Sequence, residues 1–266
     1  MWDAAQYLRF GDERSRPFFD LTARIGADKP GYVVDLGCGP GHLTEVLAER
    51  WPGARVAGVD NSPEMIEAAR ARVRPASGPG HPERIVPSIT FTLADIREWT
   101  PERAPDVMVS NAVLQWVPDH DPLVLRWADQ LARGGWLAFQ LLGNFDSPSH
   151  VIVKELAESP RWRGLLAGAE LNRQAGSPGH YMQLLAREGY EIDAWETTYQ
   201  HVLRGENPVL EWTKGTTLRP VLALLDEEQA ADFAEEYGRR VREAYRRYPF
   251  GVIFPFRRVF VVLHAV

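Results

Sequence analysis

The feature that most constrains the fold is a glycine-rich turn between a short apolar run and a run of helical character. Residues 32–36 (YVVDL) have the composition of a buried strand and lead directly to Gly37, Gly39 and Gly41. Glycine lets the backbone turn tightly and approach a ligand closely, and the helix predicted to follow (HLTEVLAER) places its N-terminus near the turn. A strand, a glycine turn and a helix in this order are typical of the βαβ units of a parallel sheet.

An acidic residue at the end of the next predicted strand indicates a ligand site. Residues 55–60 read as a second buried strand that ends in Asp60, 19 residues after Gly41. A carboxylate at this end of a parallel strand can hold both hydroxyls of a ribose. The spacing is Gly-x-Gly-x-Gly, whereas most dinucleotide sites have Gly-x-Gly-x-x-Gly, so an NAD-dependent oxidoreductase is disfavoured.

Strands and helices alternate along the first half of the chain. After the two strands just described, further strands are predicted at 89–93, 106–110 and 136–142. Helical patterns lie between them, including one over 121–133. This alternation predicts an α/β fold with a parallel sheet covered by helices on both faces.

The pattern changes beyond residue 143. Helices are predicted at 149–173, 179–188 and 207–248, and two strand-like runs lie at 190–203 and 252–266. Two late strands separated by a helical stretch suggest a hairpin that carries a helical insertion, which would form a cap. We therefore expect one domain, 1–266, with these parts: a cofactor-binding core of 1–145, helical cap segments 146–189 and 204–250, and a terminal hairpin of 190–203 and 251–266.

Composition and charge argue against several classes of function. The net charge is −6 with no long run of one sign, which argues against a dedicated nucleic-acid binder. The single cysteine, Cys38, excludes internal disulfides and a cysteine-based zinc site, and the seven histidines show no metal-ligand spacing. No apolar stretch approaches the roughly 18 residues of a transmembrane helix, and the N-terminus does not read as a secretory signal. We expect a cytoplasmic protein without metal and without a nucleic-acid, membrane or obligate protein partner.

Three motifs resemble those of the class I S-adenosyl-L-methionine-dependent methyltransferases: DLGCGPG at 35–41, VDNSPEM at 59–65 and LADIREW at 93–99. The resemblance implies a Rossmann-like sheet of seven strands whose last pair forms a reversed C-terminal hairpin, with S-adenosyl-L-methionine as the cofactor. It also implies that a set of residues binds this cofactor. They are Asp35, Asn111 and the glycines of the turn at the methionine part, Asp60 at the ribose, Met65, Asp95 and Ile96 at the adenine, and Arg16 as a candidate for the methionine carboxylate.

A closer resemblance, to the trans-aconitate methyltransferases, runs nearly end to end. It rests on the N-terminal pattern from Trp2 to Pro17 and on SNAVLQWVPDH at 110–120, TTYQHV at 197–202 and TLRP at 217–220. The chain departs from that family in the Pro/Gly-rich segment 74–88 and in the helical stretch 157–177.

The pair Gln115 and Trp116 is the predicted catalytic element. A carboxylate that attacks a sulfonium methyl group is already ionised at neutral pH, so it needs alignment and exclusion of water but no general base. A side-chain amide and an indole N–H can each donate to that carboxylate, and neutral donors orient it without lowering its reactivity as a close arginine would. The alternative is that Trp116 is a core aromatic residue and Gln115 a helix cap or a surface residue.

A substrate with three carboxylates requires further partners. The basic candidates are Arg9, Arg14, Arg16, Lys214 and Arg219, and the aromatic candidates for the pocket are Tyr7 and Trp212. Each arginine has the alternative of a solvated surface position, and each aromatic residue that of simple packing.

The expected function is an S-adenosyl-L-methionine-dependent O-methyltransferase that esterifies a carboxylate of a small polycarboxylic acid. Trans-aconitate, converted to its monomethyl ester, is the favoured substrate. One alternative is a malonyl-carrier-protein O-methyltransferase, which shares the Gln-Trp pair but would need a basic docking face that the net charge does not favour. The others are methylation of nitrogen or hydroxyl on a small metabolite and a non-catalytic cofactor-binding module.

Overall fold

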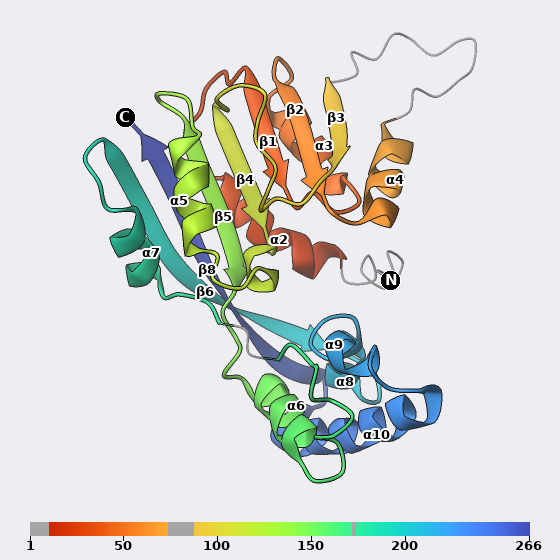
Figure 1. Ribbon diagram of the computed structural model, residues 1–266. Helices are drawn as coiled ribbons and strands as arrows, with labels where there is room; N and C mark the ends of the chain where they lie inside the picture. The colour runs from red at the N-terminus through yellow and green to blue at the C-terminus, as the bar shows by residue number, and fades with distance from the viewer. Residues whose placement is uncertain (1–10, 74–87, 172–173) are drawn as a thin grey trace. The chain divides into compact units, whose positions relative to one another are not determined.

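The computed structural model describes residues 11–73, 88–171 and 174–266 (Figure 1). The chain divides into two compact units. The first unit contains the described parts of 1–141 together with 176–196 and 259–266, and the second contains those of 142–175 and 197–258. Residues 176–189, which the sequence pattern places with the cap, group with the first unit. That both units act as one domain stays a prediction.

A mostly parallel sheet runs through the fold. Its strands are β1 (Tyr32–Leu36), β2 (Arg55–Asp60), β3 (Ile89–Leu93), β4 (Val107–Asn111), β5 (Trp136–Leu142), β6 (Tyr190–Leu203), β7 (Arg247–Tyr248) and β8 (Gly251–Ala265). They lie in the order β3-β2-β1-β4-β5-β8-β6, β7 pairs with β8, and the pairs among the first five strands are parallel. β8 runs against β5 (Figure 1). The predicted α/β, Rossmann-like sheet with a reversed C-terminal hairpin is confirmed, and the two-residue β7 is an addition.

Helices accompany each part of the sheet. Those of the first unit are α2 (Gly11–Thr22), α3 (His42–Arg50), α4 (Pro63–Arg72), the short 3-10 helix η1 (Leu114–Trp116), α5 (Asp121–Asp129) and α7 (Pro178–Leu185). Those of the second unit are α6 (Pro148–Glu158), α8 (Pro208–Lys214), α9 (Arg219–Leu222) and α10 (Glu227–Ala244). In Figure 1, α5 lies in front of the parallel strands and α2 behind them, as expected for a sheet covered on both faces.

The turn after β1 requires glycine for steric reasons. All five residues of β1 are buried, and the turn is held because the N–H groups of Gly37 and Cys38 both donate to the carbonyl oxygen of Val59, at 2.7 and 3.0 Å. Gly37 has a φ of 79°, and a Cβ placed on it would lie 2.2 Å from the side chain of Val113. A larger residue at position 37 would therefore be strained and would also push on the loop after β4.

Local signals also determine where α4 begins. The side chain of Ser62 caps the helix by accepting the N–H of Met65 at 3.3 Å, and Pro63 occupies the first helical position. Ile66 and Phe91 belong to one apolar cluster between α4 and β3. The apolar side of this helix thus has a partner in the sheet.

Two predicted helices are shorter or more divided than the sequence pattern indicates. The helix expected over 149–173 ends at Glu158, since Ser159 precedes a proline and adopts an extended conformation. The stretch 207–248 forms three helices, and the last begins at a capping box in which Asp226 and Gln229 satisfy each other's N–H groups. Helical periodicity alone does not reveal such breaks, because the apolar spacing continues across them.

The second unit has its own buried aromatic core. Trp162 packs edge-on against Phe233, with ring centres 5.2 Å apart. Both backbone groups of Ser149 in α6 are satisfied by tyrosines, since its N–H donates to the hydroxyl of Tyr245 and its carbonyl oxygen accepts from the hydroxyl of Tyr237, each at 3.1 Å. These hydrogen bonds join α6 to the C-terminal part of α10 and the residue after it.

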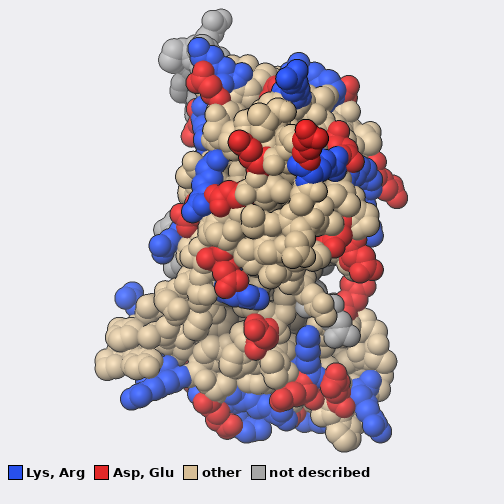
Figure 2. Space-filling model, turned by 90° about the vertical axis from the view of Figure 1, so that its left-hand side faces the viewer, with Lys and Arg blue, Asp and Glu red and all other residues tan. Residues whose placement is uncertain are grey.

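Acidic and basic side chains are interleaved over the face drawn in Figure 2, on each unit taken separately. Some opposite charges form exposed ion pairs, such as Arg55 with Glu102 at 2.8 Å and Arg187 with Asp129 at 2.5 Å. Figure 2 shows no extended basic area among the described residues of this face. Within the part of the chain that the structure describes, every helix is too short or too polar to cross a membrane.

Candidate active site

Asp60 joins the end of β2 to the glycine turn. Its carboxylate accepts the N–H of Gly39 on one oxygen and the N–H of Ser62 on the other, both at 2.9 Å. Burial raises the pKa of Asp60, and the hydrogen bonds from the backbone N–H groups of Ser62 and Gly39 oppose that rise. A Cβ built on Gly39 would meet no heavy atom of the described chain within 4 Å apart from its chain neighbours. The turn is therefore open beside an anchored carboxylate, an arrangement that suits a nucleoside ligand.

Asp35 is more deeply buried than its predicted contact with a ligand suggests. The residue is 2% exposed, and the hydroxyl of Thr44 in α3 donates to its carboxyl group at 2.6 Å. Burial raises the pKa of Asp35 to about 7; the Thr44 hydrogen bond lowers it and the nearby charge of Asp60 raises it further. In the ligand-free protein this carboxyl group is therefore partly protonated at neutral pH.

The raised pKa of Asp35 predicts a pH dependence of stability. The folded protein binds a proton here that the unfolded chain, with a carboxyl pKa near 3.8, has already lost, so the free energy of unfolding falls as the pH rises from about 4 to 7. The fall attributable to this group is about 4 kcal/mol at most. Urea unfolding of the ligand-free protein at pH 5 and pH 8 measures it. Asp35→Asn should flatten the dependence and raise the stability at pH 8; an equal fall in the variant would contradict the assignment.

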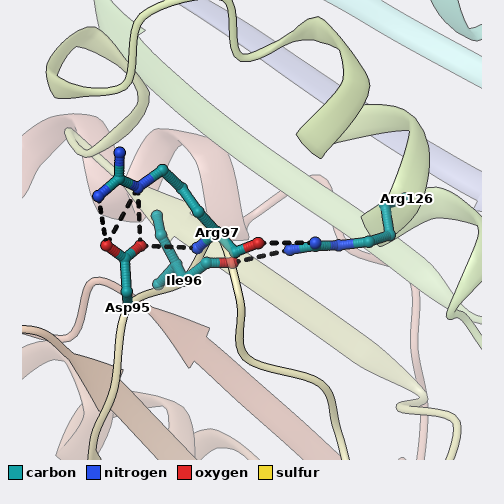
Figure 3. Close-up of polar contacts among 4 residues, drawn as sticks. All are labelled: Asp95, Ile96, Arg97 and Arg126. Carbon is teal, nitrogen blue, oxygen red and sulfur yellow. Dashed lines mark hydrogen bonds and ion pairs between the residues drawn. The ribbon is translucent and has the colours of Figure 1, made fainter.

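Two arginines hold the loop after β3 (Figure 3). The guanidinium of Arg97 donates to both carboxylate oxygens of Asp95, at 2.6 Å for the shortest contact, and thereby lowers the pKa of Asp95. The guanidinium of Arg126, from α5, donates to the carbonyl oxygens of Ile96 at 3.0 Å and Arg97 at 2.7 Å. Asp95 is consequently ionised and fixed. Because the Ile96 carbonyl is used within the protein, a contact of this residue with adenine would come through its N–H.

Asn111 ends β4 and is oriented by the neighbouring strand. The two residues Asn111 and Gln140 are paired in the sheet, and the Gln140 amide nitrogen donates to the Asn111 side-chain oxygen at 2.6 Å. This contact orients the Asn111 side chain, and its amide nitrogen can still donate to a ligand.

The loop that contains Gln115 and Trp116 follows directly and has an unusual backbone. Ala112 has a φ of 57° and Asp119 a φ of 49°, a left-handed conformation that residues other than glycine rarely adopt. The short helix η1, Leu114–Trp116, lies between them. Strained backbone of this kind is typical of segments that hold functional side chains.

The amide of Gln115 is only partly available as the predicted donor. The residue is 6% exposed, and its amide nitrogen donates to the carbonyl oxygen of Ala112 at 2.5 Å. Its side-chain oxygen is buried and has no hydrogen-bond partner among the described residues. Exchanging the two amide atoms would set oxygen against oxygen at Ala112, so this orientation is favoured. The group presented without a partner is an acceptor, and one hydrogen of the nitrogen remains for a ligand.

The other predicted site residues lie in different parts of the molecule. Met65 is buried in α4, and Arg16 is exposed on α2. In the second unit, Trp212 is 2% exposed and stacks on His201 with ring centres 5.0 Å apart, while Arg219 is half-buried at the start of α9. Tyr7 and Arg9, like the side chain of Arg14, lie outside the described residues.

Three residues that orient predicted site residues were not predicted from the sequence. They are Thr44, Arg126 and Gln140. The first could have been found, since a threonine in the first turns after the glycines is placed to face back toward Asp35. The others act on partners 20 or more residues away, and no local pattern reveals them.

Within the described residues, no cluster of three or more histidine, cysteine or acidic side chains is arranged to hold a metal ion. Cys38, inside the glycine turn, is buried, and burial strongly raises the pKa of its thiol. A thiol with a raised pKa is a poor nucleophile, so Cys38 is assigned a packing role.

The fold and the site together define a methyltransferase. A family model described as a methyltransferase domain matches residues 10–196. Among solved structures, the YcgJ protein of Bacillus subtilis superposes with a TM-score of 0.60 at 15% identity, covering 95% of this chain and 98% of that one. The phosphoethanolamine N-methyltransferase 2 of Haemonchus contortus, solved with S-adenosylhomocysteine, gives a TM-score of 0.53 at 16% identity over 93% of this chain and 52% of that chain. At these identities the likeness concerns the fold alone.

Sequence relatives narrow the family. The trans-aconitate 2-methyltransferase of Streptomyces avermitilis is 50% identical, with 99% of this chain and 96% of the relative covered. That of Rhodococcus jostii is 49% identical over 98% of both chains, and that of Mycobacterium tuberculosis 44% identical over 98% and 96%. The chain therefore belongs to the trans-aconitate 2-methyltransferase family of S-adenosyl-L-methionine-dependent enzymes. The predictions of family, enzyme class and cofactor are confirmed.

Proposed function

We propose that this enzyme transfers a methyl group from S-adenosyl-L-methionine to a carboxylate of trans-aconitate and releases the monomethyl ester. The observation that favours a carboxylate acceptor is the loop after β4. From Asn111 to Pro118 it contains no ionisable side chain, yet it presents a buried glutamine. A nitrogen or hydroxyl acceptor would need a base to take its proton, whereas a carboxylate needs none.

The residues around the glycine turn fit the cofactor. Asp60 is anchored by backbone N–H groups, and the turn at Gly39 is open beside it. The held loop of Asp95 and Ile96 offers an ionised acceptor and a backbone N–H to an adenine. When bound, the cofactor supplies an electrophilic methyl group on a sulfonium. The chain's own task is to hold this group in line with the acceptor oxygen and to keep water out.

Gln115 is suited to a position between the two reactants. The second hydrogen of its amide nitrogen and the indole N–H of Trp116 would orient the carboxylate. The buried oxygen of Gln115 would accept a hydrogen bond from a polarised or positively charged group. The C–H groups next to the sulfonium are of this kind. A buried acceptor that lacks a partner weakens the ligand-free protein, and a ligand that satisfies it gains that free energy.

The remaining carboxylates of the substrate need cationic or polar partners. We assign this role to Arg219, with Arg9, Tyr7 and Trp212 as further candidates. Arg16 is proposed for the methionine carboxylate of the cofactor. In this proposal the partner is a small molecule, with no nucleic acid, membrane or obligate protein partner, and the enzyme works in the cytoplasm.

A substrate panel tests the proposal. Release of S-adenosylhomocysteine is measured with trans-aconitate, cis-aconitate, isocitrate, malonyl-carrier protein and a fatty acid at equal concentration. We expect the highest kcat/KM with trans-aconitate. Turnover on the carrier protein alone would favour the malonyl-carrier alternative, and cofactor binding without turnover on any acid would favour a non-catalytic module.

A further inference from the structure

A buried pair of side chains connects the Gln115 loop to α7. His120, 8% exposed, lies at the end of this loop, and Tyr181, fully buried, lies in α7. The Nε2 atom of His120 is 2.8 Å from the Tyr181 hydroxyl, and the Nδ1 atom is 3.1 Å from the carbonyl oxygen of Val117. Val117 directly follows Trp116. The pair therefore contacts the residue that directly follows the predicted catalytic element.

The direction of each hydrogen bond follows from the chemistry of the partners. A carbonyl oxygen only accepts, so Nδ1 of His120 must hold the hydrogen and donate to Val117. In the neutral ring Nε2 is then an acceptor, and the Tyr181 hydroxyl donates to it. The same hydroxyl oxygen accepts the N–H of Gly176 at 3.3 Å. The three bonds point in one direction from Gly176 to Val117, an arrangement in which each bond strengthens the next.

The surroundings of Tyr181 keep this chain of bonds in place. Burial raises the pKa of Tyr181 to about 12, so the hydroxyl keeps its hydrogen at neutral pH. Phe139 of β5 packs edge-on against the tyrosine ring, with ring centres 5.2 Å apart. The next residue in α7, His180, contacts Asp121 at 3.0 Å. Two adjacent residues of α7 thus bind two adjacent residues at the end of the loop.

We propose that Tyr181 and His120 are positioning residues for methyl transfer, which hold the loop of Gln115 and Trp116 in its reactive conformation. The inference rests on the proposed function of that loop. The loop starts and ends at residues with a left-handed backbone, Ala112 and Asp119. Because such a backbone is unfavourable, the loop needs an external contact to maintain it. Most of the proposed cofactor residues lie on β1, β2 and the loop after β3, and Asn111 is held by Gln140 of β5, so other contacts hold them in place.

Tyr181→Phe tests the proposal, since it removes one hydroxyl and retains the ring. We expect kcat/KM for the acceptor to fall about tenfold, which corresponds to one buried hydrogen bond and a misplaced reactive group. The Kd for S-adenosyl-L-methionine should stay within about twofold. Hydrogen exchange of the amides in 113–120 should accelerate, while that of β1 and α3 should not change.

Tyr190→Phe is the matched control, because the Tyr190 hydroxyl donates to the carbonyl oxygen of Ala128 at 3.0 Å in the same unit but away from the loop. It should leave kcat/KM and the exchange of 113–120 unchanged. His120→Gln, whose amide oxygen can still accept from Tyr181, should retain more activity than His120→Leu. Wild-type kcat/KM and wild-type exchange in Tyr181→Phe would overturn the proposal. Inactivity of the wild-type enzyme on every acid would instead reject the proposed function, and the exchange measurement would still decide on the positioning role.

Discussion

Asp60→Ala is expected to weaken binding of S-adenosyl-L-methionine at least about 100-fold, measured by isothermal titration. Hydrogen bonds to a charged group contribute roughly 1.5–3 kcal/mol each. In Asp60→Ala the two ribose hydroxyls would each lose their hydrogen bond to the carboxylate, which accounts for the expected loss of affinity. The substitution also releases the N–H of Gly39, because the same carboxylate holds the turn. We therefore expect the effect to exceed that of a simple contact residue.

Asp106→Ala provides the matched control for Asp60. The Asp106 carboxylate also accepts two backbone N–H groups, those of Gly31 and Tyr32, at 2.8 Å each. It does so at the opposite, amino-terminal end of the sheet strands, away from the glycine turn. Asp106→Ala should lose about as much stability as Asp60→Ala, while its cofactor affinity stays near that of the wild type. Equal losses of affinity in both variants would show that Asp60 acts through the fold rather than through the ribose.

Gln115→Ala and Trp116→Phe are each expected to lower kcat/KM about 100-fold or more, with the Kd for S-adenosyl-L-methionine nearly unchanged. The reason is that these side chains are proposed to align the acceptor, and misalignment of a reacting oxygen costs roughly two orders of magnitude in rate. Steady-state release of S-adenosylhomocysteine with trans-aconitate, together with titration of the cofactor, measures both quantities.

Gln130→Ala and Trp127→Phe are the matched controls for these variants. Gln130 has a buried side-chain oxygen without a hydrogen-bond partner among the described residues, and the indole nitrogen of Trp127 is likewise buried without one. Trp127 lies near the C-terminal end of α5, and Gln130 directly follows that helix. They should affect stability and leave kcat/KM within about threefold of the wild type. Full activity in Gln115→Ala and Trp116→Phe would refute the proposed role of the loop.

The part of the site that could be predicted from sequence is the part built from local backbone chemistry. The glycine turn after β1 and Asp60 at the end of β2 both follow from residue types at short spacing, because backbone conformation is decided within a few residues. The strand β6, Tyr190–Leu203, has the predicted bounds for the same reason. A helix boundary such as Glu158 was missed, since one Ser-Pro step outweighed a continuing apolar period.

The orientation of the site side chains could not be predicted, because it depends on loop conformation and on how the helices and strands pack. Gln115 was predicted as a catalytic residue, and only the structure reveals that its nitrogen already donates to the carbonyl oxygen of Ala112. Asp35 was expected at a ligand, and its exposure of only 2% results from packing that the sequence does not show. The contact of His120 with Tyr181 joins residues 61 positions apart. Each of these details decides what the site can donate or accept.

Transfer of a labelled methyl group tests the central claim most directly. The enzyme is incubated with trans-aconitate and S-adenosyl-L-methionine that contains a ¹³C-methyl group, and the products are examined by NMR spectroscopy. Our account predicts one new labelled methyl signal, that of an ester of the acid, formed in a one-to-one ratio with S-adenosylhomocysteine. No labelled ester signal, whether or not S-adenosylhomocysteine is released, would contradict it.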